Sequence, residues 1–130
     1  MTTPIPTVAL YGAVNAIINV LLAVNVSRTR GKAQVFLGTG DSEALLRASR
    51  AHGNNAEYVP LALLLLLIAE LSGGASTPLH ALGGTLTVAR ILQAHGMLAG
   101  VIPTRVIGTV LTWLLIAGIA VYTLILRYGG

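Results

Sequence analysis

Long apolar stretches, separated by short polar segments, constrain this chain more than any other feature. The 130 residues are 55% hydrophobic and only 9% charged, and the mean hydropathy is +0.81. A soluble domain carries about 25% charged residues, and so short a chain has too little interior to bury this much apolar surface away from water. The sequence therefore predicts a single integral membrane domain.

Helix-starting and turn-forming residues divide the apolar sequence into four segments. Ser42 or Asp41 suits an N-cap, with Glu43 in the first turn that follows. A breaker-rich turn ends at Pro78, and Pro103 suits the first turn of a last helix. We therefore expect an all-α membrane protein, a four-transmembrane-helix up-down bundle. The helices are predicted at about residues 6–28, 42–71, 78–98 and 103–127.

The basic residues gather at one end of this predicted bundle. Seven of the eight fall there: Arg28, Arg30, Lys32, Arg47, Arg50, Arg90 and Arg105. Only Arg127 and the acidic Glu70 fall toward the other end. Because cytoplasmic loops carry an excess of Lys and Arg, we expect both termini outside and both basic loops in the cytoplasm. The basic pI therefore reflects membrane orientation, and no nucleic-acid partner is expected, since basic and aromatic residues do not interleave on one surface.

Metal and thiolate chemistry have little support in the sequence. The chain contains no cysteine, so any reactive thiol would have to belong to a ligand. The histidines, His52, His80 and His95, fall on different helices or faces without an acidic cluster beside them. We therefore predict no metal site.

The second predicted helix carries a polar stripe in its first half. The stripe consists of Arg47, Arg50, Asn54, Glu57 and Tyr58. At 100° per residue these side chains share an arc of roughly 100°. His52 lies well off that arc.

Glu57 is the costly member of the stripe. It lies about 21 Å from the end of its helix at Leu71, at 1.5 Å per residue, and so falls inside or at the edge of a hydrocarbon core about 30 Å thick. A carboxylate at that depth needs a partner or contact with water, and Arg50 or Arg90 is the expected partner. Two interpretations stay open: a structural ion-pair network that fixes helix packing, or a polar pocket that faces a ligand.

The chemistry of the stripe indicates what such a ligand would be. Guanidinium groups bind carboxylates in a bidentate manner, and a carboxylate favours an ammonium group. A small zwitterion with more than one carboxylate satisfies both. The leucine-rich wall beyond the stripe suits an apolar co-substrate that arrives from the lipid.

The segment from Arg50 to Pro60, RAHGNNAEYVP, resembles the signature of the MAPEG family, the membrane-associated proteins in eicosanoid and glutathione metabolism. Arg90 and the Pro103-Thr-Arg105 sequence fall where that family has similar residues. The resemblance covers nearly the whole chain, including its length, four spans and the basic loop after the first helix. The small bacterial members are the most similar.

This resemblance implies a homotrimer in a bacterial inner membrane, with glutathione as co-substrate between neighbouring subunits near the cytoplasmic face. Arg50, Asn54 and Glu57 would bind the glutathione backbone, and Glu57 would receive its amino group. Arg28 matches a family arginine that also reaches the tripeptide. Arg105 resembles the arginine proposed to stabilise the thiolate. The expected glutathione-binding set is completed by Arg47, Tyr58 and Arg90.

The implied activity is that of a glutathione transferase or peroxidase acting on lipophilic electrophiles. The chain departs from enzymatic members that have tyrosines where it reads Gln93 to Met97 and Val106 to Thr109. Gly53 replaces the basic residue of eicosanoid enzymes, so a specialised eicosanoid synthase is not expected.

Two other functions are compatible with a four-span chain of this length. A non-catalytic member that binds lipid or a partner protein is the alternative, and Arg28, Arg30 and Lys32 suit lipid headgroups as well as a ligand. A small multidrug exporter is disfavoured, because those transporters depend on an acid in the first span and this span has none.

Overall fold

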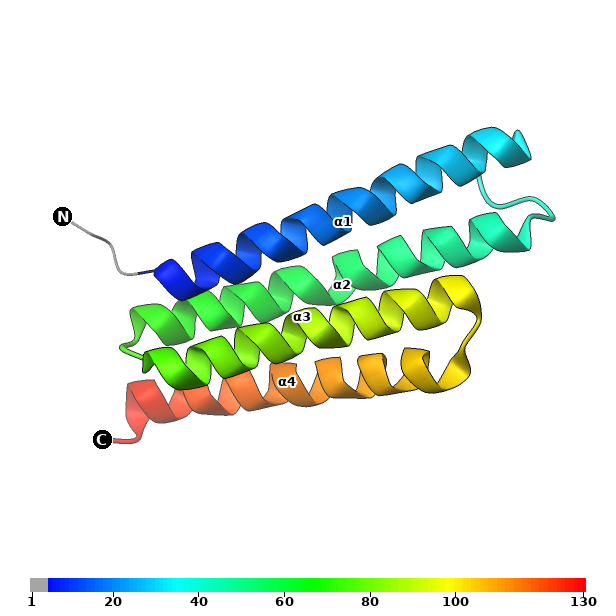
Figure 1. The fold of residues 1–130 in the computed structure, drawn as a ribbon. Coiled ribbons are helices and arrows are strands. Elements are labelled where there is room, and N and C mark those ends of the chain that lie inside the picture. The colour runs from blue at the N-terminus through cyan, green and yellow to red at the C-terminus, as the bar shows by residue number, and fades with distance from the viewer. Residues whose placement is uncertain (1–4) are drawn as a thin grey trace.

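Four helices make up the structure, a computed structural model that describes residues 5–130. They are α1 (Pro6–Ala33), α2 (Glu43–Leu71), α3 (Ser76–Ala99) and α4 (Ile102–Tyr128). The helices alternate in direction, so the α1–α2 loop and the α3–α4 turn lie at one end of the bundle, and the α2–α3 turn lies at the other with the C-terminus (Figure 1). The prediction of an all-α, four-helix bundle is confirmed for the described residues.

Two helix boundaries differ from the predicted ones by more than one residue. α1 continues past residue 28 to Ala33, because the basic residues there are good helix formers and one glycine does not interrupt them. It ends where Gln34 adopts a left-handed conformation with φ 53°. α3 begins at Ser76, so Pro78 lies in its first turn, where a missing N–H leaves no hydrogen bond unmade. The predicted N-cap is confirmed, since the Ser42 hydroxyl accepts a hydrogen bond from the Leu45 N–H.

Three of the helices, α1, α2 and α4, are long and apolar enough to cross a membrane. The third helix, α3, has 24 residues, which span about 36 Å, but its polar residues lower its hydropathy. These include Arg90, Gln93 and His95 in its second half. That α3 also crosses the membrane therefore stays a prediction.

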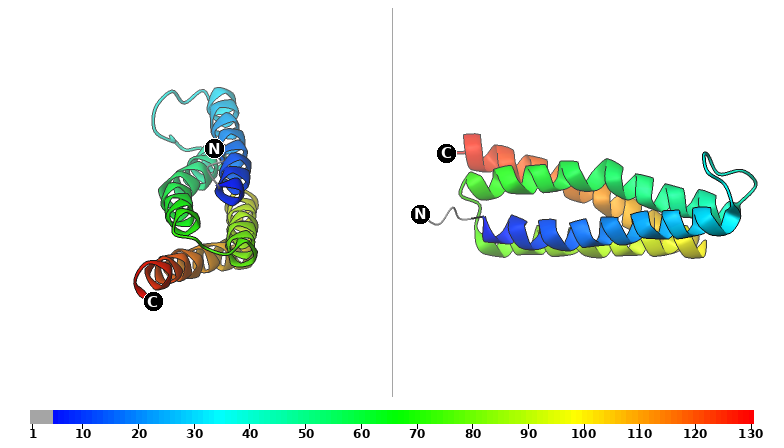
Figure 2. Two further views of the ribbon diagram at one scale, coloured as in Figure 1. Left: turned by 90° about the vertical axis from the view of Figure 1, so that its left-hand side faces the viewer. Right: turned by 90° about the horizontal axis from the view of Figure 1, so that it is seen from above.

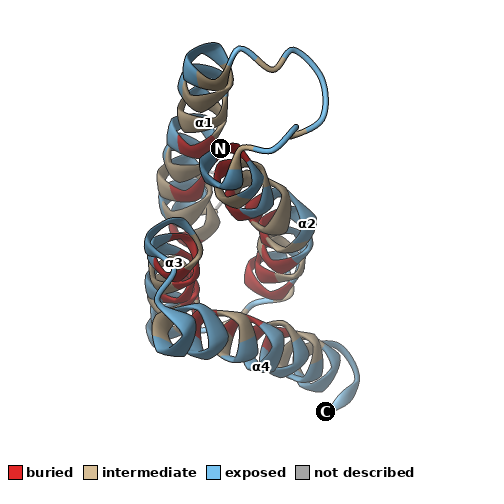
Figure 3. Ribbon diagram, turned by 90° about the vertical axis from the view of Figure 1, so that its right-hand side faces the viewer, coloured by how far each residue is buried: buried red, intermediate tan, exposed pale blue. Residues whose placement is uncertain are grey.

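α2 and α3 occupy the middle of the bundle. Both contact α1 and α4, whereas α1 and α4 do not contact each other. Figure 2 shows the arrangement of the four helices from two further sides. Buried residues face the space that the four helices surround, and the outer faces are exposed (Figure 3). For a membrane protein, lipid or another subunit covers such apolar outer faces.

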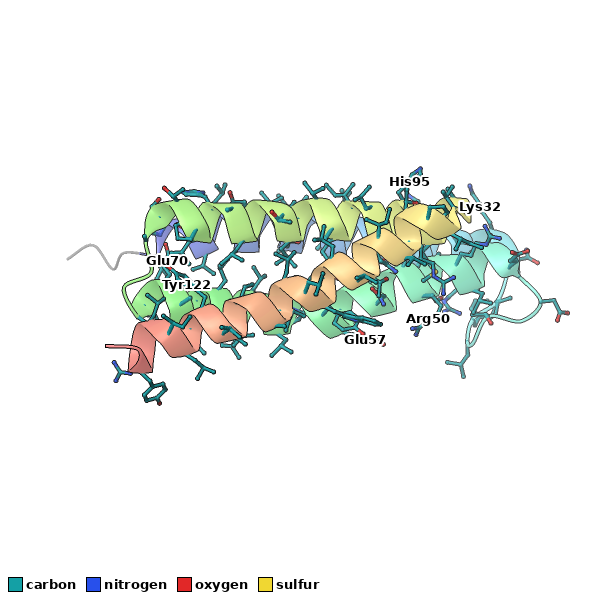
Figure 4. All side chains as sticks on the ribbon, turned by 90° about the horizontal axis from the view of Figure 1, so that it is seen from below. Lys32, Arg50, Glu57, Glu70, His95 and Tyr122 are labelled. Atoms are coloured by element: carbon teal, nitrogen blue, oxygen red, sulfur yellow. The ribbon has the colours of Figure 1, made fainter. Side chains whose placement is uncertain are left out.

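Glycines bring α3 and α4 into close contact at the basic end of the bundle. A Cβ atom added at Gly108 would lie 2.6 Å from the backbone oxygen of Ala89, and one at Gly96 would overlap the backbone of Arg105. Small residues allow such close approach of two helices. Farther along, α4 runs obliquely away from α3 and toward α2 (Figure 4). The position of Arg105 is therefore fixed by backbone packing.

At the opposite end, Glu70 of α2 caps the start of α1. Its two carboxylate oxygens accept hydrogen bonds from the backbone N–H groups of Thr7 (2.9 Å) and Val8 (2.8 Å). The residue at the N-cap of α1, Ile5, offers no side-chain hydrogen bond. A carboxylate from another helix therefore satisfies N–H groups that the helix itself leaves unpaired, and its charge complements the helix dipole.

Replacing Glu70 tests this tertiary cap. Glu70→Ala is expected to lower the free energy of unfolding by about 1–2 kcal/mol, and Glu70→Gln by less, because an amide oxygen still accepts a hydrogen bond. Thermal unfolding in detergent measures both. Arg127→Ala, an exposed change at the same end, is the control, and an alanine variant as stable as this control would contradict the role of Glu70.

Candidate functional site

A cleft between α2 and the α3–α4 turn brings three of the predicted arginines together. Arg47 and Arg50 of α2 and Arg105 of α4 line a cavity of about 430 Å³. The other lining residues are Glu43, Leu46, Met97, Gly100 and Ile102. We call this space the arginine cleft. It combines three guanidinium groups with an apolar wall, at the basic end of the bundle.

Local structure holds Arg47 against the α3–α4 turn. Its guanidinium contacts Gly100, whose φ of +71° closes α3 in a left-handed conformation, and a Cβ atom at that position would displace the guanidinium. Arg47 also forms an i,i+4 ion pair with Glu43. This pair is partly exposed and adds little stability, but it orients the guanidinium at the edge of the cleft.

Arg50 and Glu57 lie together on the outer face of α2 (Figure 4). Arg50 Nη1 and Glu57 Oε1 are 3.9 Å apart, and the two side chains are 53% and 56% exposed. Of the two partners expected for Glu57, the structure therefore confirms Arg50. Because the contact is long and both groups are more than half exposed, each remains free to bind a ligand.

Arg90, by contrast, is completely buried between the helices. Its Nε donates to Asn55 Oδ1 (3.1 Å), and its Nη1 donates to Thr112 Oγ1 (3.3 Å). Its Nη2 donates to Asn54 Oδ1 (2.6 Å) and to Gln93 Oε1 (3.2 Å). These neutral acceptors on three helices hold the guanidinium inside the bundle, whereas its predicted place toward the basic membrane face stays a prediction.

Arg90 also orients two residues of the polar stripe. The ring of Tyr58 lies 6.0 Å from the guanidinium carbon of Arg90, within the range of a cation–π contact. A guanidinium can only donate hydrogen bonds, so the Asn54 amide must turn its oxygen toward Arg90. The amide nitrogen of Asn54 is then the group left for a ligand, and Asn54 can offer a hydrogen-bond donor.

The polar network continues to α1. Asn55 Nδ2 donates to Asn19 Oδ1 (3.1 Å), and Asn15 Nδ2 donates to Thr87 Oγ1 of α3 (3.0 Å). Sequence reasoning missed Asn55, Gln93 and Thr112 as partners of Arg90. One feature of the sequence did indicate a buried polar partner on α2. Asn55 interrupts an apolar seam formed by Ala48, Ala51, Val59 and Ala62.

Arg28 is not brought to the arginine cleft within one chain. It lies exposed on α1, and α1 makes no contact with α4, the helix that carries Arg105. The predicted site residues therefore lie in four different places. Arg47, Arg50 and Arg105 line the cleft; Asn54, Glu57 and Tyr58 continue along α2 from it; and Arg90 supports these from inside the bundle, while Arg28 lies apart.

The chain is an all-helical bundle of the membrane class, with an arginine-lined cleft beside an Asn-x-x-Glu-Tyr stripe. Residues 8–125 match the model of the MAPEG family, and the chain belongs to that family. Among individual proteins it is similar to the inner membrane protein YecN of Escherichia coli (strain K12). The two are 31% identical over 105 residues, which cover 81% of this chain and 80% of that protein. YecN of Escherichia coli O6:H1 matches to the same extent.

The buried guanidinium gives a stability prediction. Arg90→Met is expected to lower the free energy of unfolding by about 2–5 kcal/mol, because it leaves several buried acceptors without a donor. Arg50→Met, at an exposed position on the neighbouring helix, is the matched control and should change stability by less than about 1 kcal/mol. Equal unfolding temperatures for the two variants would show that the network around Arg90 does not hold the bundle together.

Proposed function

We propose that this protein is a glutathione-dependent transferase or peroxidase that acts on lipophilic electrophiles at the arginine cleft. The observation that carries the proposal is the convergence of Arg47, Arg50 and Arg105 on one cavity, with the open carboxylate of Glu57 two helical turns along α2 from Arg50. Membership of the MAPEG family, which includes glutathione-dependent proteins, supports the same conclusion.

The charges of the site match those of glutathione, which has two carboxylates and one ammonium group. Arg47 and Arg50 offer bidentate donors to the carboxylates, and Glu57 offers an acceptor to the ammonium group. Asn54, with its oxygen held by Arg90, offers an amide donor to a peptide carbonyl between them. The two ends of the tripeptide would bind at different places, because Arg47 and Arg50 lie about two to three helical turns before Glu57 along α2.

Arg105 is the residue proposed to activate the thiol. A guanidinium beside a thiol lowers the pKa of that thiol, because it stabilises the thiolate. The thiolate then attacks the electrophilic carbon of the second substrate, a carbon–sulfur bond forms, and the leaving group departs with its electron pair. The apolar residues Met97 and Ile102 line the same cleft and suit a substrate that enters from the lipid.

The exposure of Glu57 supports a site that is completed by a second subunit. This carboxylate is 56% exposed in the single chain, at a depth where contact with lipid is costly. A neighbouring subunit or a water-filled site between subunits would remove that cost. A neighbour would also bring its own Arg28 to the cleft, which the fold of one chain does not do. We therefore propose a homotrimer of four-span subunits in the inner membrane, with both termini outside.

Thiol activation is tested by the conjugation of glutathione to 1-chloro-2,4-dinitrobenzene. Arg105→Ala is expected to reduce kcat by about 100-fold, with a smaller effect on glutathione binding. Arg105→Lys should restore part of the rate, because it keeps a positive charge. A rate unchanged by Arg105→Ala in correctly folded protein would exclude this residue as the thiolate stabiliser.

Recognition of the ammonium group is tested with an analogue of glutathione that lacks the α-amino group. Glu57→Gln is expected to weaken glutathione binding by about tenfold or more, since a charged hydrogen bond contributes roughly 1.5–3 kcal/mol. Binding of the analogue should change little, and calorimetry in detergent measures both. If Glu57→Gln weakened both ligands equally, Glu57 would have a structural role instead.

The second candidate function is a non-catalytic one, with lipid or a partner protein in the same cleft. It is favoured by the apolar Met97 on the cleft wall and by Gln93 beneath it, in a stretch where enzymatic members have tyrosines. Glutathione bound without an ultraviolet thiolate signal would favour this candidate.

A further inference from the structure

The loop between α1 and α2 holds two large apolar side chains almost completely exposed. Phe36 is 95% exposed and Leu37 is 92% exposed. The loop lies at the end of the bundle where α1 carries Arg28, Arg30 and Lys32 (Figure 1). An exposed aromatic–aliphatic pair beside basic residues indicates a surface that binds something outside the chain.

Hydrogen bonds from Arg30 give this loop a defined shape. Arg30 Nη1 donates to the backbone oxygens of Val35 (3.0 Å) and Gly38 (2.8 Å), the residues on either side of the apolar pair. The backbone N–H of Val35 donates in return to the oxygen of Arg30 (3.3 Å). Phe36 and Leu37 are therefore held at the tip of an ordered turn.

The loop and the last turns of α1 line a hollow at the end of the apolar part of α1. The hollow has a volume of about 690 Å³ and is lined by Ser27, Arg30, Gly31, Gln34 and Phe36. The apolar part of α1 runs from Pro6 to Ser27, about 33 Å at 1.5 Å per residue, which matches a hydrocarbon core of about 30 Å. Since Ser27 and Phe36 line the same hollow, Phe36 lies at the level of the lipid headgroups.

We propose that this hollow binds an anionic phospholipid of the surrounding membrane. Arg30 faces the phosphate with the part of its guanidinium that does not hold the loop, and the Ser27 hydroxyl donates a hydrogen bond. Phe36 and Leu37 insert among the glycerol and upper acyl groups, as aromatic residues do at membrane interfaces. The exposed Lys32 adds positive charge, which favours anionic lipid over zwitterionic lipid.

Depth-dependent fluorescence quenching tests this proposal in nanodiscs. Phe36→Trp in a Trp113→Phe background places a single tryptophan at the tip of the loop, because Trp113 is the chain's one tryptophan. Brominated lipid is expected to quench this tryptophan more strongly in phosphatidylglycerol nanodiscs than in phosphatidylcholine ones, and aqueous iodide is expected to quench it weakly. Thr39→Trp, in the same loop but outside the apolar pair, is the matched control and should respond mainly to iodide.

A second variant tests the contribution of charge without breaking the loop. Lys32→Gln leaves the hydrogen bonds of Arg30 intact, and the lost charge should raise the phosphatidylglycerol fraction needed for half-maximal quenching roughly fivefold. Quenching of the introduced tryptophan mainly by iodide would overturn the proposal, because the loop would then lie in water. Protection from both quenchers would overturn it as well, since another subunit would then cover the pair. None of these outcomes depends on glutathione binding.

Discussion

A guanidinium group buried among apolar helices determines much of this structure. Arg90 is completely buried, and an unpaired charge there would cost far more than the bundle could tolerate. Acceptors from α2, α3 and α4 surround it: Asn54 and Asn55, Gln93, and Thr112. The contacts with Asn54, Asn55 and Thr112 require α2, α3 and α4 to keep their present rotation and register. The polar network therefore specifies the packing that the apolar contacts, which have no direction of their own, leave undetermined.

The same network connects the interior of the bundle to its proposed site. Asn54 and Tyr58 have one side turned toward Arg90 and belong to the stripe that also carries Arg50 and Glu57. On the other wall of the cleft, the close contact of Gly96 with the backbone of Arg105 places the proposed thiol-activating residue. Interior packing thus sets the distance between the two walls on which glutathione would bind.

The sequence predicted the helices and the polar stripe well, because both follow from periodicity along one helix. The start of α2 at Ser42 and the pairing of Arg50 with Glu57 depend only on local spacing. The partners of Arg90 come from two other helices as well as from its own, so no spacing along a single helix predicted them. The cap that Glu70 provides for α1 joins residues more than sixty positions apart, and no local pattern announces such a contact.

Two features of the proposed site are not accounted for by a single chain. The carboxylate of Glu57 is more than half exposed at a predicted depth where contact with lipid is costly. Arg28 lies on a helix that does not contact α4. The second subunit that we propose would account for both features at once. The apolar wall formed by Met97 and Ile102 leaves the cleft accessible to a substrate dissolved in the membrane.

The most direct test is a cryo-electron microscopy structure of the protein in nanodiscs with saturating glutathione. The density is predicted to lie in the arginine cleft of a trimer, with carboxylates at Arg47 and Arg50, the amino group at Glu57 and the sulfur beside Arg105. An empty cleft at saturation, or glutathione density away from these four residues, would contradict the proposed function.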